Sequence, residues 1–302
     1  MCPYRSPRNP LPCAPEVAPQ APLLGGRYEV LERLGAGGMG VVSRVHDRLT
    51  QRTLAVKQPR WRGLAEWEPR LDPRASLERE YRVLTRLDHP GILRAYDFGV
   101  DEGGEPYLVL DALEHVTPLT AGVRCAARRE GVRALVEMFD ALHHMHSRGY
   151  LHRDIKPSNV VLCSSARRAQ RVHVCLIDFG LARALGDPAL ADEDPCHPSL
   201  IGSALYLAPE LVDGQAASPA SDLYAAGMIA AQVFTGVDPM QRTGPRPTLA
   251  RPRDLPREWV GGAADLLGVD DRAVALLRRL LARDPRARCA RADEAAAALR
   301  AL

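Results

Sequence analysis

The stretch that decides the fold spans residues 152–159 and reads His152-Arg153-Asp154-Ile155-Lys156-Pro157-Ser158-Asn159. It brings a carboxylate, an amide, an imidazole and two cations together within a few positions. A helical pattern with one apolar face precedes it at residues 131–148, and a short apolar strand follows at residues 160–162. Polar groups crowded between two inward-facing elements make this the most specific stretch of the chain, and the alternative is a charged surface turn.

Lysine is almost absent from the chain. Among 40 basic side chains only Lys57 and Lys156 are lysines, and the others are arginine. Arginine replaces lysine where a solvated charge suffices, but not where a compact ammonium is needed. Lys156 lies in the stretch quoted above, and Lys57 ends a predicted strand at residues 53–58. Both positions are therefore candidates for phosphate contact, whereas a lone strand lysine could otherwise be a solvated edge residue.

Lys57 shares one face of its strand with Ala55, because side chains alternate along a strand. The small alanine leaves room for a flat ring beside an ammonium that reaches a phosphate. Glu80 lies on the apolar face of a predicted helix at residues 75–87. A carboxylate there either extends to solvent or pairs with Lys57, and the pairing explains an inward-facing charge.

A glycine-rich segment stands between predicted strands at residues 27–31 and 41–46. It reads Leu34-Gly35-Ala36-Gly37-Gly38-Met39-Gly40, followed by Val42 one position later. A dinucleotide fingerprint lies between a strand and a helix, so this segment is of another kind. Glycines in a hairpin let backbone N–H groups approach phosphates without obstruction by a Cβ, and the alternative is an ordinary hairpin.

Asp178-Phe179-Gly180 follows an apolar strand predicted at residues 172–177. A carboxylate at a strand end can hold a hard cation such as Mg²⁺ through oxygen. The alternative is a simple turn aspartate.

Bulk composition excludes several classes of protein. The 302 residues are 46% apolar and 25% charged, with a net charge of +3, which gives no basic field for nucleic acid. No apolar run reaches the length of a membrane span. Seven cysteines form an odd set without a CxxC pair, which predicts reduced structural thiols in a cytoplasmic protein. The cluster His143, His144 and His146 offers only two ligands on one helix face, too few for zinc.

The order of patterns predicts an α+β fold with two lobes. Residues 1–26 form a proline-rich leader expected to be disordered. A small β-rich lobe follows at about residues 27–111, and a larger helical lobe spans about residues 114–302, with a hinge near residues 111–113. Further strands are expected at residues 92–98 and 107–110, and further helices at residues 221–234, 271–281 and 292–301.

Taken in order, these motifs, with Ala208-Pro209-Glu210 closing the segment after Asp178, resemble the eukaryotic-type (Hanks-type) serine/threonine protein kinases in a bacterial-like form. The resemblance covers residues 27–302 and implies a protein kinase-like fold, ATP and Mg²⁺. It implies that Asp154 accepts the substrate hydroxyl proton, that Lys156 neutralises the transferred phosphoryl group, and that Asn159 and Asp178 ligate Mg²⁺. Lys57, oriented by Glu80, would hold the α and β phosphates.

The resemblance also implies an ATP site and a brace for the catalytic loop. The nucleotide would contact Leu34, Gly35, Ala36, Gly37, Gly38, Met39, Gly40, Val42, Ala55, Lys57, Leu110, Asp111 and Leu113. Leu110 would gate the back of the adenine pocket, and residues 111–113 would supply backbone hydrogen bonds. Asp222 would brace the catalytic loop, and Arg288 would pair with Glu210.

Regulation by autophosphorylation is a hypothesis. Arg153 precedes the predicted catalytic aspartate, and Ser199 is one of three hydroxyl residues between Asp178 and Glu210. A phosphate on Ser199 would pair with Arg153, and self-association would serve the transfer. Two alternatives to a protein kinase are a pseudokinase scaffold and a small-molecule phosphotransferase with the same fold. The intact Lys57, Asp154 and Asp178 disfavour the first, and the full segment up to Glu210 disfavours the second.

Overall fold

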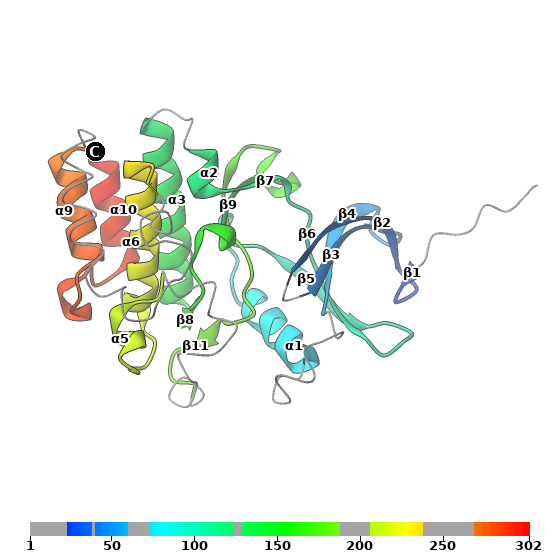
Figure 1. Cartoon of the computed structure of the whole chain (residues 1–302). Helices are drawn as coiled ribbons and strands as arrows, with labels where there is room; N and C mark the ends of the chain where they lie inside the picture. The colour runs from blue at the N-terminus through cyan, green and yellow to red at the C-terminus, as the bar shows by residue number, and fades with distance from the viewer. Residues whose placement is uncertain (1–22, 38–39, 60–72, 124–127, 188–205, 238–268) are drawn as a thin grey trace, which may run out of the picture.

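Alternating apolar residues at the start of the described chain build one antiparallel sheet. The computed structural model describes residues 23–37, 40–59, 73–123, 128–187, 206–237 and 269–302. The sheet order is β1-β2-β3-β4-β6-β5. These strands are β1 (Leu23–Leu24), β2 (Tyr28–Gly37), β3 (Gly40–Asp47), β4 (Arg52–Gln58), β5 (Ala95–Val100) and β6 (Pro106–Asp111). Helix α1 (Pro73–Leu84) packs against β5 and β6, and together they form the smaller lobe (Figure 1).

Helices form the larger lobe on the other side of the molecule (Figure 1). They are α2 (Leu119–Gly122), α3 (Arg128–Ser147), α5 (Pro209–Val212), α6 (Pro219–Thr235), α9 (Asp271–Leu280) and α10 (Ala292–Arg300). Helix α6 is apolar and buried along most of its length. Helices α3 and α9 pack against α6, and α10 packs against α3 and α9. A capping box between Ser218 and Ser221 starts α6, and left-handed Gly236 ends it.

Short strands lie where the lobes meet. Strands β7 (Glu114–Pro118), β9 (Val160–Ser164) and β10 (His173–Leu176) form a sheet in the order β10-β9-β7. Strand β8 (Tyr150–Leu151) pairs with β11 (Arg183–Ala184). The 3₁₀ turns are η1 (Pro157–Asn159), η2 (Ala166–Arg168) and η4 (Pro285–Ala287). A bridge between Ile92 and Leu176 ties the smaller lobe to β10. Residues after β10 therefore have a fixed position relative to the sheet of the smaller lobe.

One hydrophobic core runs through both lobes. It joins Ala55 and Leu108 of the six-stranded sheet to Leu142, Phe179 and Leu223 of the larger lobe. A second, smaller cluster around Tyr28 and Val109 fills the far face of the sheet. Burial of this continuous apolar surface stabilises the arrangement of the lobes.

The predicted α+β fold with two lobes is confirmed, with shifts at element ends. The helix expected at residues 75–87 ends at Leu84 because the next residues form a tighter turn, with Leu87 N donating to the Leu84 carbonyl over 3.2 Å. The strand expected from Ile92 begins at Ala95, since Ile92 pairs with β10 instead. Strand β1 adds to the sheet ahead of the boundary predicted at residue 27. Most of the predicted leader, residues 1–22, lies outside the described residues.

Within the described part of the chain, no helix combines the length and apolarity that a membrane crossing requires.

Candidate active site

Asp154 lies at the centre of the predicted catalytic loop and is only 3% exposed. Its Oδ2 accepts hydrogen bonds from Lys156 Nζ at 2.7 Å and from Asn159 Nδ2 at 2.8 Å. Asn159 Nδ2 also donates to the Asp154 carbonyl over 2.9 Å. Three residues that the sequence analysis singled out therefore meet at one carboxylate, which is held in a single orientation.

A second buried carboxylate fixes the backbone of this loop. Asp222 of α6 accepts hydrogen bonds from the amides of His152 and Arg153, both at 2.9 Å. His146 of α3 contacts the same carboxylate through Nε2 at 2.9 Å. Burial alone would raise the pKa of Asp222, but the hydrogen bonds and charges of His146 and His152 outweigh it and hold the pKa below its usual value.

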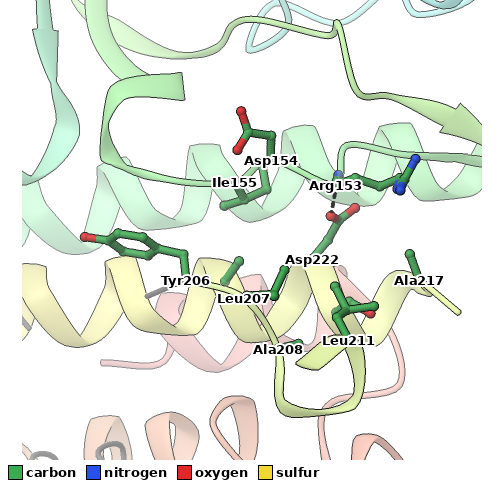
Figure 2. Close-up of a pocket in the computed structure, with 11 residues that line it drawn as sticks. Arg153, Asp154, Ile155, Tyr206, Leu207, Ala208, Leu211, Ala217 and Asp222 are labelled. Atoms are coloured by element: carbon green, nitrogen blue, oxygen red, sulfur yellow. Dashed lines mark hydrogen bonds between the residues drawn. The ribbon is translucent and has the colours of Figure 1, made fainter. Parts of the chain in front are cut away.

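The bracing has a conformational purpose, because Arg153 has a φ of +68°, a left-handed conformation that arginine rarely adopts. Figure 2 shows Asp222 directed at the Arg153 amide while the Asp154 carboxylate points away from it. Arg153, Tyr206, Leu211 and Ala217 are among the residues that line a cavity of about 20 Å³ here, room for roughly one water molecule. The backbone that carries Asp154 is thus held from α6, and the Asp154 carboxylate faces the other side.

Lys57 stands between two carboxylates. Its Nζ donates to Glu80 Oε2 at 2.8 Å and Oε1 at 3.0 Å, and to Asp178 Oδ1 at 3.0 Å. Burial alone would lower the pKa of Lys57, but the negative charges of Glu80 and Asp178 outweigh it and raise the pKa above its usual value. The ammonium is therefore charged at neutral pH, and the pairing predicted for Glu80 is present.

Asp178 is placed by contacts from both lobes. Its backbone has a φ of +62°, and the following amide, Phe179 N, donates to Glu80 Oε1 over 3.3 Å. The Phe179 ring packs against the His152 ring with centroids 4.8 Å apart. Just before it, Ile177 N donates to the Asn159 carbonyl over 2.9 Å. These contacts set Asp178 beside the catalytic loop although 24 residues separate it from Asp154 in the sequence.

Asn159 and Asp178 fit a hard divalent cation. One oxygen of Asp178 pairs with Lys57, and the other has no hydrogen-bond partner among the described residues. Asn159 spends its amide nitrogen on Asp154 and keeps its Oδ1, whose neighbour is the Ser158 hydroxyl at 3.3 Å. Carboxylate and amide oxygens are ligands of Mg²⁺, which usually completes its shell with water and phosphate oxygens.

Several of the predicted nucleotide-lining residues lie on strands β3, β4 and β6, near Lys57. Ala55 lies opposite Leu110 in the β4–β6 pairing, and Lys57 lies opposite Val42 in the β3–β4 pairing. Ala55 and Leu110 are buried, and Val42 and Leu113 are partly buried against the core that joins the lobes. This arrangement offers an apolar surface next to the Lys57 ammonium.

The glycine-rich segment forms the end of the β2–β3 hairpin. Leu34, Gly35 and Ala36 are exposed, and Gly38 and Met39 lie outside the described residues. Gly40 has a φ of +137°, and a Cβ there would lie 2.2 Å from the Gln58 carbonyl oxygen, so the fold itself requires glycine. At Gly35 a Cβ would meet no atom of the described residues within 4 Å, so no contact with that part of the chain requires glycine here.

Comparison with known proteins agrees with the geometry. Residues 28–299 match the model of the protein kinase domain family. The probable serine/threonine-protein kinase SCO3848 of Streptomyces coelicolor is 35% identical over 70% of this chain and 30% of its own length. Serine/threonine-protein kinase PknB of Mycobacterium tuberculosis is 32% identical over 90% of this chain and 42% of its own length. The chain thus spans less than half the length of these relatives.

A solved structure gives the same result. The crystal structure of the PknI kinase domain from Mycobacterium tuberculosis, a double mutant, superposes with a TM-score of 0.64 at 28% identity. The match covers 93% of this chain and 97% of that one. The chain belongs to the protein kinase domain family. The resemblance to bacterial-like serine/threonine kinases drawn from the motifs is thereby confirmed.

Two further contacts of the kinase domain hold Tyr206 and Glu210 in place. Arg288 forms a bidentate pair with Glu210 at 2.7 Å on both oxygens, fully buried beneath the Tyr224 ring. The Tyr206 hydroxyl donates to Gln232 Oε1 over 3.2 Å. The pair predicted for Arg288 is present. Ser199, the hypothesised phosphorylation site, lies outside the described residues, and Arg153 Nη1 reaches the Leu181 carbonyl at 3.5 Å.

Sequence reasoning missed a set of polar contacts behind the hinge of the kinase domain. The Asp111 side chain turns away toward Tyr96, whose hydroxyl donates to Oδ1 over 2.8 Å. Arg52 in turn donates to the Tyr96 hydroxyl over 2.9 Å, and the Asp111 amide is occupied by the Arg94 carbonyl. These contacts position the hinge backbone. In the sequence, only the apolar residues of β6 before Asp111 indicated where the hinge begins.

The histidine cluster also has roles that spacing did not reveal. His146 supports Asp222 as described, whereas His144 stacks on His89 with ring centroids 5.2 Å apart. His143 lies 3.7 Å from Asp293 of α10. No three metal-ligating side chains gather anywhere in the ranges that the structure describes.

Proposed function

We propose that this chain is an active protein kinase that transfers the γ-phosphoryl group of ATP to serine or threonine hydroxyls of proteins. The observation that carries the proposal is that the Asp154 carboxylate and the Lys57 ammonium are each held in place by their partners. Asp154 is held by Lys156 and Asn159, and Lys57 is held by Glu80 and Asp178. Phosphoryl transfer depends mainly on such positioning and on electrostatic stabilisation.

Lys57 is proposed to bind the α and β phosphates of ATP. The charged ammonium has three donors, and its two carboxylate partners fix the direction from which a phosphate is met. Val42, Ala55, Leu110 and Leu113 would line the adenine, and the backbone of residues 34–40 would cover the phosphates.

Mg²⁺ would be held by Asn159 and Asp178, whose amide and carboxylate oxygens suit it. When bound it neutralises charge on the phosphates during transfer. The chain's own part is to keep these oxygens in place, Asp178 through Lys57 and Asn159 through Asp154.

Asp154 is proposed to orient the substrate hydroxyl and accept its proton. Oδ2 is taken by Lys156 and Asn159, so the carboxylate cannot rotate away from the incoming group. Lys156 is 20% exposed at its side chain, which lets its ammonium meet charge on the transferred group as well.

Protein substrates are favoured over small molecules by the segment that ends at Glu210. The buried pair with Arg288 anchors that segment to α6 and η4 beside Asp154, where a polypeptide could lie. We include autophosphorylation on Ser199, with Arg153 as the phosphate partner and self-association during transfer, and a cytoplasmic location. The three described cysteines form no disulfide, which supports that location.

The test is transfer of label from γ-labelled ATP to a generic basic protein in the presence of Mg²⁺, beside an Asp178→Asn variant. We expect label on serine or threonine with the unaltered chain and loss of most of it with the variant. Label on neither the basic protein nor the chain itself would instead favour a scaffold without activity. Label confined to an added small alcohol would favour the small-molecule phosphotransferase.

A further inference from the structure

Two thiols and an imidazole that the proposed mechanism does not use share one face of the β9–β10 hairpin. Cys163 lies opposite His173 in the antiparallel register, and Cys175 lies opposite Val161. Side chains of alternate residues point to the same face, so Cys163, His173 and Cys175 are neighbours. Cys163 is 1% exposed, and the other two are 2% exposed.

Hydrogen bonding determines the tautomer of the neutral His173 ring, and so which ring nitrogen carries the lone pair. His173 Nδ1 lies 2.9 Å from the Arg171 carbonyl oxygen, which can only accept, so Nδ1 carries the proton of the neutral ring. Nε2 then has a lone pair and lies 3.9 Å from Cys163 Sγ, which also lies 3.9 Å from the His173 carbonyl. A thiol, a base and a group that orients the base are the parts of an activated nucleophile.

The electrostatics agree with this orientation. A hydrogen bond with Cys175, together with the contact to His173, outweighs burial and lowers the pKa of the Cys163 thiol to about 6. Burial works against protonation of His173, but Cys163 and the Arg171 carbonyl raise its pKa above the usual value. Cys289 is equally buried, at 1%, yet burial raises the pKa of its thiol. Cys289 is thus a matched reference within the same chain.

We propose that Cys163 is a peroxide-reactive thiol with His173 as its base, and that Cys175 resolves the oxidised sulfur to a Cys163–Cys175 disulfide. Thiolate character selects the site, and burial limits the oxidant to a small neutral molecule such as hydrogen peroxide. A metal site is the other use of two thiols and an imidazole, but these residues do not form such a group within the described ranges.

The chemistry balances with hydrogen peroxide as the oxidant. The Cys163 thiolate attacks one peroxide oxygen, the O–O bond breaks, and the sulfur becomes a sulfenic acid while the leaving hydroxide takes a proton from His173. The Cys175 sulfur then attacks the Cys163 sulfur, forms the S–S bond and displaces the hydroxyl group, which leaves as water with the Cys175 proton. Overall two thiols and one peroxide give one disulfide and two waters.

Disulfide formation requires the hairpin to move. Diagonal neighbours in an antiparallel pair have Cα atoms about 7–8 Å apart, whereas disulfides span about 4.4–6.8 Å. Strand β9 begins directly after Asn159, and β10 ends two residues before Asp178. Oxidation should therefore displace the two proposed metal ligands and slow phosphoryl transfer. This consequence rests on the proposed function, but the disulfide does not.

The test is peptide mapping of the full chain after hydrogen peroxide, alkylation and trypsin. Arg167, Arg168 and Arg171 lie between the two cysteines, so trypsin separates a peptide of residues 154–167 from one of residues 172–183. We expect these two peptides linked, with the loss of two hydrogens, in the unaltered chain and in Cys289→Ser. Both Cys163→Ser and Cys175→Ser should abolish the link.

His173→Gln isolates the base, because glutamine keeps a donor for the Arg171 carbonyl but cannot take the thiol proton. Linkage at pH 7 should slow about tenfold in this variant, provided its thermal unfolding matches that of the unaltered chain. Oxidation of Cys289 as fast as Cys163, stable sulfenic acid without a link, or unchanged alkylation of Cys163 would each overturn the proposal.

A parallel assay separates the two claims. Transfer of label should fall on oxidation of the unaltered chain, recover with dithiothreitol, and be insensitive to peroxide in Cys163→Ser. Full linkage with an unchanged transfer rate would refute the displacement of Asn159 and Asp178. A chain that links normally but never transfers label would count against the proposed function alone.

Discussion

The catalytic loop and the glycine-rich hairpin differ in how they are held. Asp154 is 3% exposed and is fixed by two side-chain donors, and its backbone is braced by Asp222. In the hairpin, residues 34–36 are exposed, and the β2–β3 register shifts between Arg33 and Gly35. The chain thus positions the groups that act on the reacting atoms in advance, whereas the cover over the phosphates is left accessible to the nucleotide.

Lys57 lies opposite Val42 of the hairpin strand β3 and its ammonium contacts Asp178, so its replacement should have a large effect. Lys57→Arg preserves the charge but replaces a compact ammonium with a planar fork that cannot make the same contacts to Glu80 and Asp178. We expect the rate of label transfer to fall at least about 100-fold.

Thr53→Arg is the matched control, because it adds an arginine at an exposed position of the same strand, β4. Its transfer rate should remain close to that of the unaltered chain. Near-normal transfer by Lys57→Arg would show that a compact cation is not required at this position.

Asp222→Asn should loosen the braced region. The variant keeps the side chain's shape but loses the charge that accepts two amides and the His146 contact, so unfolding free energy at pH 7 should fall by about 2–3 kcal/mol. Asp140→Asn breaks the exposed pair with Arg300 and should change it by less than about 1 kcal/mol. Denaturant titration measures both, and equal effects would contradict the bracing role.

The effect of Asp222→Asn on stability should depend on pH in a definite direction. Because the folded-state pKa of Asp222 is lowered, its contribution is complete above the unfolded value near 3.9 and is lost as pH falls through the folded value. The stability difference between the unaltered chain and Asp222→Asn should therefore shrink below about pH 4. A difference that grows in acid would have the wrong sign.

A pair of glycine substitutions tests the hairpin with smaller effects. Gly40→Ala meets the Gln58 carbonyl at a left-handed φ and should lower unfolding free energy by about 1–3 kcal/mol. Gly35→Ala meets no atom among the residues that the structure describes, so stability should hold while the KM for ATP rises a few-fold. Kinetics and denaturation on both variants separate the two roles, and the reverse pattern would refute the assignment.

The sequence predicted those parts of the molecule whose pattern is local. Helix α3 carries clear apolar periodicity, strand β4 carries a short apolar run, and the motifs around Asp154 and Asp178 are compact enough to read directly. Strands β8 and β11 have two residues each, too few to show alternation, and they form only because the chain returns to pair them. Ile92 lies outside the strand expected to begin there, because it forms an isolated bridge with Leu176, 84 positions later in the sequence.

The residues of the site were predictable from the sequence, but the contacts that support them were not. Residue types and order indicated which groups belong together, and Lys57, Glu80 and Asp178 do meet. The supporting contacts were not readable, since His146 and Asp222 or Tyr96 and Asp111 become neighbours only through packing of separate elements. An exposed tyrosine and a buried one look alike in a strand pattern.

The most direct test of the account compares ATP binding and phosphoryl transfer in Asp154→Asn. Asparagine preserves size but cannot accept the hydroxyl proton, and it leaves Lys57, Glu80 and Asp178 untouched. We predict that the affinity for ATP with Mg²⁺ stays within about twofold, while label transfer falls about 10²–10⁴-fold. Transfer to protein at the unaltered rate would contradict the assignment of Asp154, and with it the proposed mechanism.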